Sequence, residues 1–368
     1  MSIRYFYIDD DPKSQNKVDG FDNNELSIVA MQHKDSWEEQ FSFLKDNENN
    51  FDGLILDLKL DDLPNENNKR ADFRGTSIAQ EIRTRQKEGA LKSFPIVLFS
   101  ANDKTQQALE KSGKDLFDIL IDKSKLDDKA FPIYTSQLID LSNGYTTLSD
   151  SSLEINTVLN IDETLLDSRF AGEYYESKKS PVHIQSKFII SEFLSKQGLL
   201  IDEDTLAARL GIDKLQSKDW ILLLENLSAT KYQGVFCNGW PRWWMHLIEN
   251  WWKENIKSDT FLRSTHAKDR VDKIKQSTGL IHLAVAEKIN KATSDEFWTI
   301  CKGFNRPLDP VDGMLIKGQD NLYSWQEPEY VSVEAALWRK NIDNWVDVAD
   351  MEKEKYERLK VLYSRKKQ

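Results

Sequence analysis

Four short apolar runs follow one another within the first 125 residues, and each leads into residues with chemically active side chains. The runs end in Ile8-Asp9-Asp10, Leu56-Asp57, Phe99-Ser100-Ala101 and Ile121-Asp122-Lys123. Continuous apolar runs of this length are typical of parallel strands that are buried on both faces. Ligands of open parallel α/β sheets bind just beyond the carboxyl ends of the strands. We therefore expect Asp9, Asp10, Asp57, Ser100 and Lys123 to meet in one crevice.

The residue types at these strand ends indicate phosphoryl chemistry. Neighbouring carboxylates repel one another and attract a hard divalent cation, and Mg²⁺ prefers one or two carboxylates together with water and phosphate oxygens. A carboxylate can also attack phosphorus to give an aspartyl phosphate. A lysine ammonium and a serine hydroxyl can stabilise the charge that develops on the transferred group. The set suffices for Mg²⁺-dependent phosphoryl transfer onto an aspartate.

In order and residue type, these four elements resemble the receiver domain of two-component response regulators. The family has an acidic pair after its first strand, an aspartate after the third, Ser or Thr followed by a small residue at the fourth, and Lys after the fifth. The resemblance covers residues 1–145. It implies a flavodoxin-like α/β fold, a doubly wound parallel five-stranded sheet of order 2-1-3-4-5.

The resemblance also assigns roles to the residues. Asp57 would be the phosphoacceptor, Ser100 would donate a hydrogen bond to the phosphoryl group, and Lys123 would pair with it. The Mg²⁺ ligands would be Asp10, Asp57 and the Lys59 carbonyl, with Asp9 holding a bound water. Ala101 would leave space for the phosphoryl group, and a histidine kinase or another phosphodonor would be a partner.

Two segments depart from the family pattern. Residues 12–24 hold only two large apolar residues and many turn formers, so the first helix should be short or missing. After Asp57 the turn glycine is reached only at Gly75, beyond a long polar loop with Leu63 and Phe73 as its apolar anchors. We expect this loop, residues 60–74, to be mobile and to gate the site.

Length and composition bound the remainder of the chain. With 368 residues, the chain has room for a second domain, which we place at residues 150–368. Residues 1–145 carry 19 basic and 27 acidic residues, and the remainder carries 31 and 34, which gives no support to broad nucleic-acid binding. The two cysteines favour neither a disulfide framework nor structural zinc, and no apolar run approaches a membrane span. We expect a soluble, cytoplasmic protein of bacterial type.

The second half is rich in tryptophan and predicts a mainly α-helical output or effector domain. Ten of the eleven tryptophans lie there. Apolar residues at helical spacing predict a helix over residues 241–256, with Trp244, Ile248 and Trp251 in the core. An interaction groove is the alternative for this stripe. Residues 205–220 resemble a helix-turn-helix only faintly, and an ordinary helical hairpin is preferred.

The expected function is that of a phosphorylation-regulated response regulator, in which the receiver controls an unusual output domain by protein–protein contact. The helical domain would bind a partner protein or self-associate. No enzymatic activity is indicated beyond phosphorylation and dephosphorylation of Asp57. Three alternatives stay open. The first is a pseudo-receiver scaffold that recruits a partner, in a defence system for example. The others are a DNA-binding regulator and an effector enzyme of a defence or conflict system.

Overall fold

A computed structural model describes residues 2–21, 23–101, 113 and 115–365. The chain divides into two compact units, Met1–Ser191 with Gln233–Trp240, and Glu192–Tyr232 with Pro241–Gln368. The first unit thus extends well beyond the expected boundary near residue 145. The reason is local packing, because segments that follow the receiver-like region are bound to it. Within this unit, for example, the Asp140 carboxylate accepts hydrogen bonds from the backbone N–H groups of Asn238 and Gly239.

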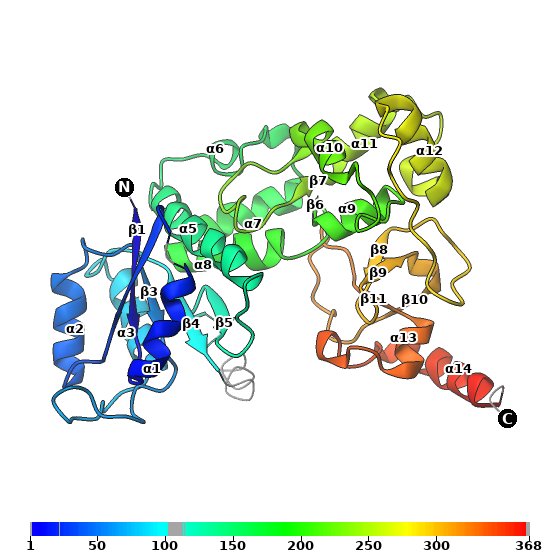
Figure 1. Ribbon diagram of the computed structural model, residues 1–368. Coiled ribbons are helices and arrows are strands. Elements are labelled where there is room, and N and C mark those ends of the chain that lie inside the picture. Colours follow the sequence, from blue (N-terminus) through cyan, green and yellow to red (C-terminus); the bar gives the residue numbers. More distant parts are fainter. Residues whose placement is uncertain (1, 22, 102–112, 114, 366–368) are drawn as a thin grey trace. The chain divides into compact units, whose positions relative to one another are not determined.

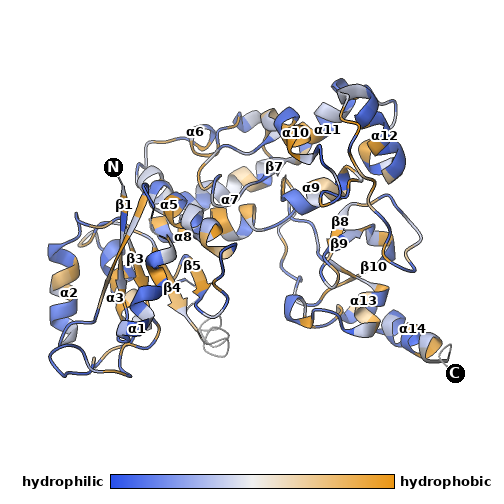
Figure 2. Cartoon of the chain, in the orientation of Figure 1, coloured by the Kyte–Doolittle hydropathy of each residue, from blue (hydrophilic) through white to orange (hydrophobic). Residues whose placement is uncertain are grey.

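A parallel five-stranded sheet forms the centre of the first unit (Figure 1). Its order is β2-β1-β3-β4-β5, which confirms the predicted flavodoxin-like order. The strands are β1 (Ile3–Ile8), β2 (Leu26–Met31), β3 (Gly53–Leu56), β4 (Ile96–Ser100) and β5 (Ile119–Asp122). Figure 2 shows the apolar colouring of the central strands, and every residue of β3 and β4 is buried. Burial on both faces is what their continuous apolar sequences require.

The first unit has seven described α-helices, and some of them pack on the two faces of the sheet. They are α1 (Pro12–Gln15), α2 (Trp37–Asp46), α3 (Gly75–Lys87), α5 (Ala130–Leu148), α6 (Ile155–Leu159), α7 (Ser168–Lys178) and α8 (Val182–Lys187). One core cluster joins Phe6 and Leu54 of the sheet to α2 and α3. On the opposite face, the Tyr5 hydroxyl donates to the Leu138 carbonyl of α5 at 2.8 Å.

The first helix is short, as predicted from its turn-rich sequence. Only four residues form α1, which Asp11 caps through its side chain, and the 3₁₀ helix η1 (Asn16–Phe21) follows. Phe21 at the end of η1 is buried and meets the Phe99 and Phe131 rings edge to face. This segment is therefore fixed by an aromatic anchor in place of a full helical face.

A buried ion pair connects the sheet to helices on both sides of it. The Arg83 guanidinium of α3 binds the Asp118 carboxylate at 2.8 Å, and both side chains are almost fully buried. The Tyr145 hydroxyl of α5 donates to the same carboxylate at 2.6 Å. Removing one partner of such a pair leaves an uncompensated buried charge, so this network fixes α3, the start of β5 and α5 relative to one another.

The second unit contains helices and two small sheets, whereas a mainly helical domain was predicted. Its helices are α9 (Glu203–Arg209), α10 (Trp220–Asn226), α11 (Met245–Glu254), α12 (Ala267–Thr278), α13 (Val333–Trp338) and α14 (Lys353–Arg365). Its strands are β6 (Leu200–Ile201), β7 (Trp243–Trp244), β8 (Thr299–Cys301), β9 (Arg306–Leu308), β10 (Gly313–Leu315) and β11 (Tyr330–Ser332). The last four strands form one sheet of order β10-β11-β8-β9. Strands of three residues are too short to give an alternating sequence pattern, so the sequence did not predict them.

The tryptophan-rich segment is a strand followed by a helix, which corrects the prediction of one helix over residues 241–256. Trp243 and Trp244 form β7 and pair with β6, and α11 begins only at Met245. Successive strand residues point to opposite faces. Accordingly, Trp243 joins the main apolar cluster, whereas Trp244 packs against Phe193. The predicted core residues Trp244, Ile248 and Trp251 are all buried.

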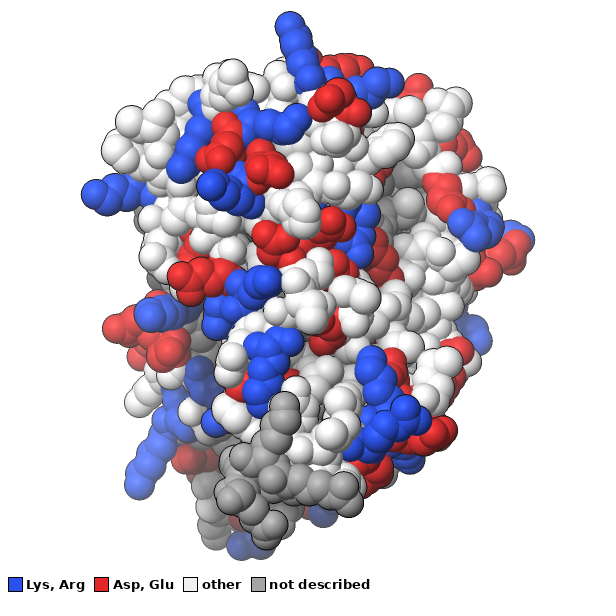
Figure 3. Space-filling view, turned by 90° about the vertical axis from the view of Figure 1, so that its right-hand side faces the viewer, with Lys and Arg blue, Asp and Glu red and all other residues white. Residues whose placement is uncertain are grey.

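The described residues show no tight helix-turn-helix in the segment that resembled one. Ten residues, 210–219, separate α9 from α10, whereas that motif needs a turn of three or four. Arg209 is fully buried, and Lys214 pairs with Asp204 at 2.7 Å. On the face seen in Figure 3, basic and acidic side chains are interspersed and form no broad basic area. Among the described helices, none has the length and apolar character needed to cross a membrane.

We predict that Trp244→Ala destabilises the second unit by about 3–5 kcal/mol, because the change empties a buried aromatic site. Trp338→Ala is the matched control, since this side chain is 49% exposed. The control should destabilise the unit clearly less than Trp244→Ala does, because half of the Trp338 side chain is already in contact with water. Thermal melting, together with hydrogen exchange of α11 peptides, measures the change in stability of both variants. Equal melting of Trp244→Ala and the parent protein would show that the Trp244 ring does not support the core.

Candidate functional site

The carboxyl ends of four parallel strands bring the predicted site residues together. Asp9 and Asp10 directly follow β1, Asp57 follows β3, Ser100 ends β4, and Lys123 follows β5. The register of the sheet brings the carboxyl ends of these strands to the same edge. It pairs Ile8 with Leu56, Leu56 with Leu98, and Ser100 with Asp122.

A cavity of about 200 Å³ lies at this edge of the sheet. All seven residues to which the sequence assigned a role line it: Asp9, Asp10, Asp57, Lys59, Ser100, Ala101 and Lys123. Asp11, Ser14 and Asp62 add further polar groups to the wall. The cavity is large enough for a phosphoryl group with water, and it holds more acidic than basic side chains.

Lys123 is the centre of the charge arrangement. Its ammonium Nζ lies 2.5 Å from Asp9 Oδ2 and 2.5 Å from Asp57 Oδ1. The Lys123 side chain is 4% exposed, and the rings of Tyr7 and Phe99 lie 5.5 Å and 5.1 Å from the ammonium. Shielding from water strengthens both ion pairs. Lys123 therefore neutralises about one of the three negative charges of Asp9, Asp10 and Asp57.

Asp57 has an unusual protonation equilibrium. Burial raises the pKa of its carboxyl to about 6, although the Lys123 ammonium acts in the opposite direction. The Lys59 backbone N–H donates to Asp57 Oδ2 at 2.7 Å.

Gly75 fits directly against the Asp57 carbonyl, where a Cβ would lie 2.1 Å from that oxygen. Any larger residue at position 75 would displace the Asp57 backbone.

The loop from Leu60 to Arg74 is better anchored than its polar sequence suggested. The Leu63 backbone N–H donates to Asp10 Oδ2 at 2.6 Å. The Asn65 amide donates to Asp35 Oδ1 at 2.7 Å, and Lys69 pairs with Asp35 at 2.9 Å. Leu60, Ala71 and Phe73 are buried, whereas the expected anchor Leu63 is 42% exposed. Of the two expected apolar anchors, Phe73 is buried and Leu63 is not, and the carboxylates of Asp10 and Asp35 outside the loop supply further, polar anchors.

Tyr7 belongs to the site and was missed in the sequence. Its hydroxyl donates a short hydrogen bond to Asp9 Oδ2, the oxygen that also binds Lys123. Burial raises the pKa of the Tyr7 hydroxyl far above its ordinary value, so the group remains a donor. The two-residue spacing between Tyr7 and Asp9 could have identified Tyr7 from the sequence. Residues i and i+2 of a strand lie on the same face of the sheet.

The donor chemistry of the cavity fits a hard divalent cation. Among the described residues, no group of three His, Cys, Asp or Glu side chains is already arranged around a metal position. Mg²⁺ does not need such a cage, because it keeps several waters and takes one or two carboxylates. Asp10 and Asp57 supply those carboxylates in one cavity. Burial raises the pKa of Asp10, and a bound cation would favour its charged form.

Comparison with known proteins gives only distant similarity. No known family matches the chain, and no curated protein matches it. The response regulator LqsR of Legionella pneumophila is 15% identical, with 62% of this chain and 76% of that chain covered at a TM-score of 0.29. RcsB of Salmonella enterica serovar Typhimurium, solved on promoter rprA with the phosphomimetic BeF₃⁻, is 14% identical. Its match covers 62% of this chain and 99% of that one at a TM-score of 0.26. Similarity at this level assigns no function, so the geometry of the site itself has to do so.

Proposed function

We propose that the first unit is a phosphoryl-accepting receiver and that the protein acts as a response regulator. One observation carries the proposal: the Asp57 carboxylate lies in a small cavity, 2.5 Å from the Lys123 ammonium and beside two further carboxylates. Asp57 stands after the third strand of a sheet with the 2-1-3-4-5 order, at the edge where ligands bind. Perturbed ionisation and a paired charge in a cavity are features of functional sites.

The reaction would be phosphoryl transfer from a phosphohistidine or an acyl phosphate. An Asp57 carboxylate oxygen forms the new bond to phosphorus while the bond from phosphorus to the donor breaks. Lys123 pairs with the phosphoryl oxygens, and the Ser100 hydroxyl donates a hydrogen bond to them. Mg²⁺, held by Asp10, Asp57 and the Lys59 carbonyl with Asp9 on a bound water, would supply positive charge to the transferred group. A histidine kinase is the proposed donor.

The consequence of phosphorylation would be a change in protein–protein contacts of the output unit. Transfer of a phosphoryl group recruits Lys123, which bridges Asp9 and Asp57 before the reaction. The carboxylate of Asp9 then loses the Lys123 ammonium and retains the Tyr7 hydroxyl and the Asp11 backbone N–H as donors. This exchange of partners is the local event that could shift the receiver between two states.

A scaffold that is no longer phosphorylated is the second candidate. It is favoured by the existing bonds of the acids, because Tyr7, Lys123 and Leu63 already satisfy Asp9 and Asp10. A protein of this kind would bind its partner through the same fold without Mg²⁺. The two candidates differ in a single measurable property, the acceptance of a phosphoryl group by Asp57.

We predict that acetyl phosphate with Mg²⁺ adds one phosphoryl group to the protein and that Asp57→Asn abolishes the addition. Intact-mass spectrometry measures the product, with and without EDTA. Asp46→Asn is the control, because Asp46 is an exposed aspartate at the end of α2. An unmodified parent protein would favour the scaffold, and modification of Asp57→Asn would place the acceptor elsewhere.

Ser100→Ala should slow phosphorylation, since it removes one hydrogen bond to a charged group, worth about 1.5–3 kcal/mol. This corresponds to a rate about 10- to 100-fold lower if the bond is formed fully in the transition state. Ser100→Thr retains the hydroxyl and should recover most of the rate. Initial rates of mass increase provide the comparison. Equal rates for the alanine variant and the parent protein would exclude the proposed role of this hydroxyl.

Without Mg²⁺, Asp57→Asn should stabilise the first unit at pH 7.5 but not at pH 4. The raised pKa means that native Asp57 binds its proton more tightly than the unfolded chain does, so native stability falls as pH rises from about 4 to about 6. The asparagine variant avoids this loss, on the order of 2–3 kcal/mol. Hydrogen exchange of β1 and β3 peptides measures it, with Asp46→Asn as control. A difference in stability that is independent of pH would show that the ionisation of Asp57 does not destabilise the folded unit.

A further inference from the structure

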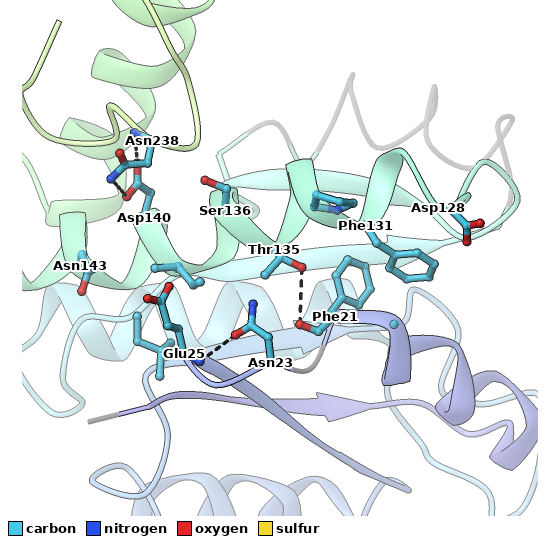
Figure 4. A pocket seen from close by; sticks show the side chains of 14 residues that line it. Phe21, Asn23, Glu25, Asp128, Phe131, Thr135, Ser136, Asp140, Asn143 and Asn238 are labelled. Carbon is cyan, nitrogen blue, oxygen red and sulfur yellow. Dashed lines mark hydrogen bonds between the residues drawn. The ribbon is translucent and has the colours of Figure 1, made fainter.

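A groove lies on one face of the first unit, apart from the strand ends that form the phosphoryl-acceptor cavity. The cavity there measures about 970 Å³ and lies between the 3₁₀ helix η1, the residues Asn23 and Glu25 that precede β2, and helix α5 (Figure 4). It is separate from the phosphoryl-acceptor cavity, with which it shares no lining residue. This volume is at the upper end of typical ligand sites.

One wall of the groove is a continuous stripe along α5. Phe131, Thr135, Ile139 and Asn143 line it at a spacing of four residues, with Ser136 beside them. Residues four apart lie on the same face of a helix. The stripe from Phe131 to Asn143 extends for about 18 Å at 1.5 Å per residue, or a little over three helical turns.

The opposite wall comes from the 3₁₀ helix η1 and from Asn23 and Glu25, which precede β2. Phe21 forms the buried floor, and its carbonyl accepts a weak 3.5 Å hydrogen bond from Thr135. Gly20 lies against the Phe131 ring, where a Cβ would be 2.6 Å from a ring carbon. Asn23 and Glu25 form the exposed rim. The floor is thus apolar and the rim polar.

The charges of the groove have one sign. Its lining contains the carboxylates of Glu25, Asp128 and Asp140 and no lysine or arginine among the described residues. Asp140 is buried, and the groups that donate to it are the uncharged N–H groups of Asn238 and Gly239. Its negative charge is therefore not neutralised by a cation there. An occupant with positive charge at both ends would match the groove.

We propose that this groove binds a basic amphipathic helix of a partner protein. An apolar floor with a polar rim is how grooves receive an amphipathic helix. Here a helix of about three turns would lie along the α5 stripe, which extends for a similar length. Its apolar side chains would pack on Phe131 and Ile139, and its lysines or arginines would face Glu25 and Asp128. The proposal does not depend on phosphorylation of Asp57.

A fluorescein-labelled 16-residue peptide, with leucines at helical spacing and lysines on both flanks, is the probe. Fluorescence anisotropy with the full chain should show binding that weakens with salt, and hydrogen exchange of α5 should slow on binding. A peptide in which every lysine is replaced by glutamate is the control for charge. Equal binding of the two peptides would overturn the proposal.

Two variants of one groove residue give the sharpest test. Ser136→Lys places a like charge against the peptide and should weaken binding about tenfold, equivalent to 1.4 kcal/mol. Ser136→Glu has a side chain of similar reach and should not weaken binding. Ile133→Lys adds the same charge to α5 at a 58% exposed residue outside the groove lining, and should bind as the parent protein does.

Two results would contradict the proposal. The first is equal affinity of all three variants, which would place the peptide elsewhere. The second is a concentration-dependent dimer that Ser136→Lys converts to a monomer, because the occupant would then be a second copy of this chain. Light scattering at several protein concentrations separates this result from binding of a partner helix.

Discussion

The placement of three carboxylates at one edge of the sheet, with Asp9 and Asp10 buried and Asp57 half-buried, is the constraint on which the site depends. Charges without counter-charges are costly in a protein interior, and one lysine cannot neutralise three acids. Lys123 bridges Asp9 and Asp57, and backbone or hydroxyl donors satisfy what remains. This excess of negative charge destabilises the native state, and a bound divalent cation would relieve it.

Helix α5 is connected to this site through aromatic rings, since the Lys123 ammonium lies 5.1 Å from the Phe99 ring and Phe21 contacts both Phe99 of β4 and Phe131 of α5. It packs on the sheet, where Tyr5 bonds to its Leu138 carbonyl, and it shares the buried Asp118 carboxylate with Arg83 of α3. The same helix forms one wall of the groove and holds the segment at Asn238 through Asp140. A shift of α5 would therefore affect packing, groove and connecting segment together. This is a physical route by which changes at the strand ends could reach other parts of the unit.

The sequence predicted the first sheet because its strands are buried on both faces and end in distinctive residues. It also predicted the convergence of Asp9, Asp10, Asp57, Ser100 and Lys123, which follows from strand order and register. It did not predict the Tyr7 hydrogen bond, the anchors of the loop after Asp57, or the domain boundary, because these depend on contacts distant in sequence. Trp243 and Trp244 were assigned to a helix because two residues of a strand are too few to show their own period.

A crystal structure with Mg²⁺ and beryllium fluoride tests the central claim most directly, because beryllium fluoride binds an acceptor carboxylate in place of a phosphoryl group. We predict density for beryllium trifluoride bound to an Asp57 carboxylate oxygen and for a cation beside Asp10 and Asp57. The Lys123 ammonium should contact a fluorine atom of the beryllium trifluoride. Lys123 would then no longer bridge Asp9 and Asp57. A structure in which Lys123 still bridges them, with neither ion in the cavity, would contradict the assignment of Asp57 as phosphoacceptor.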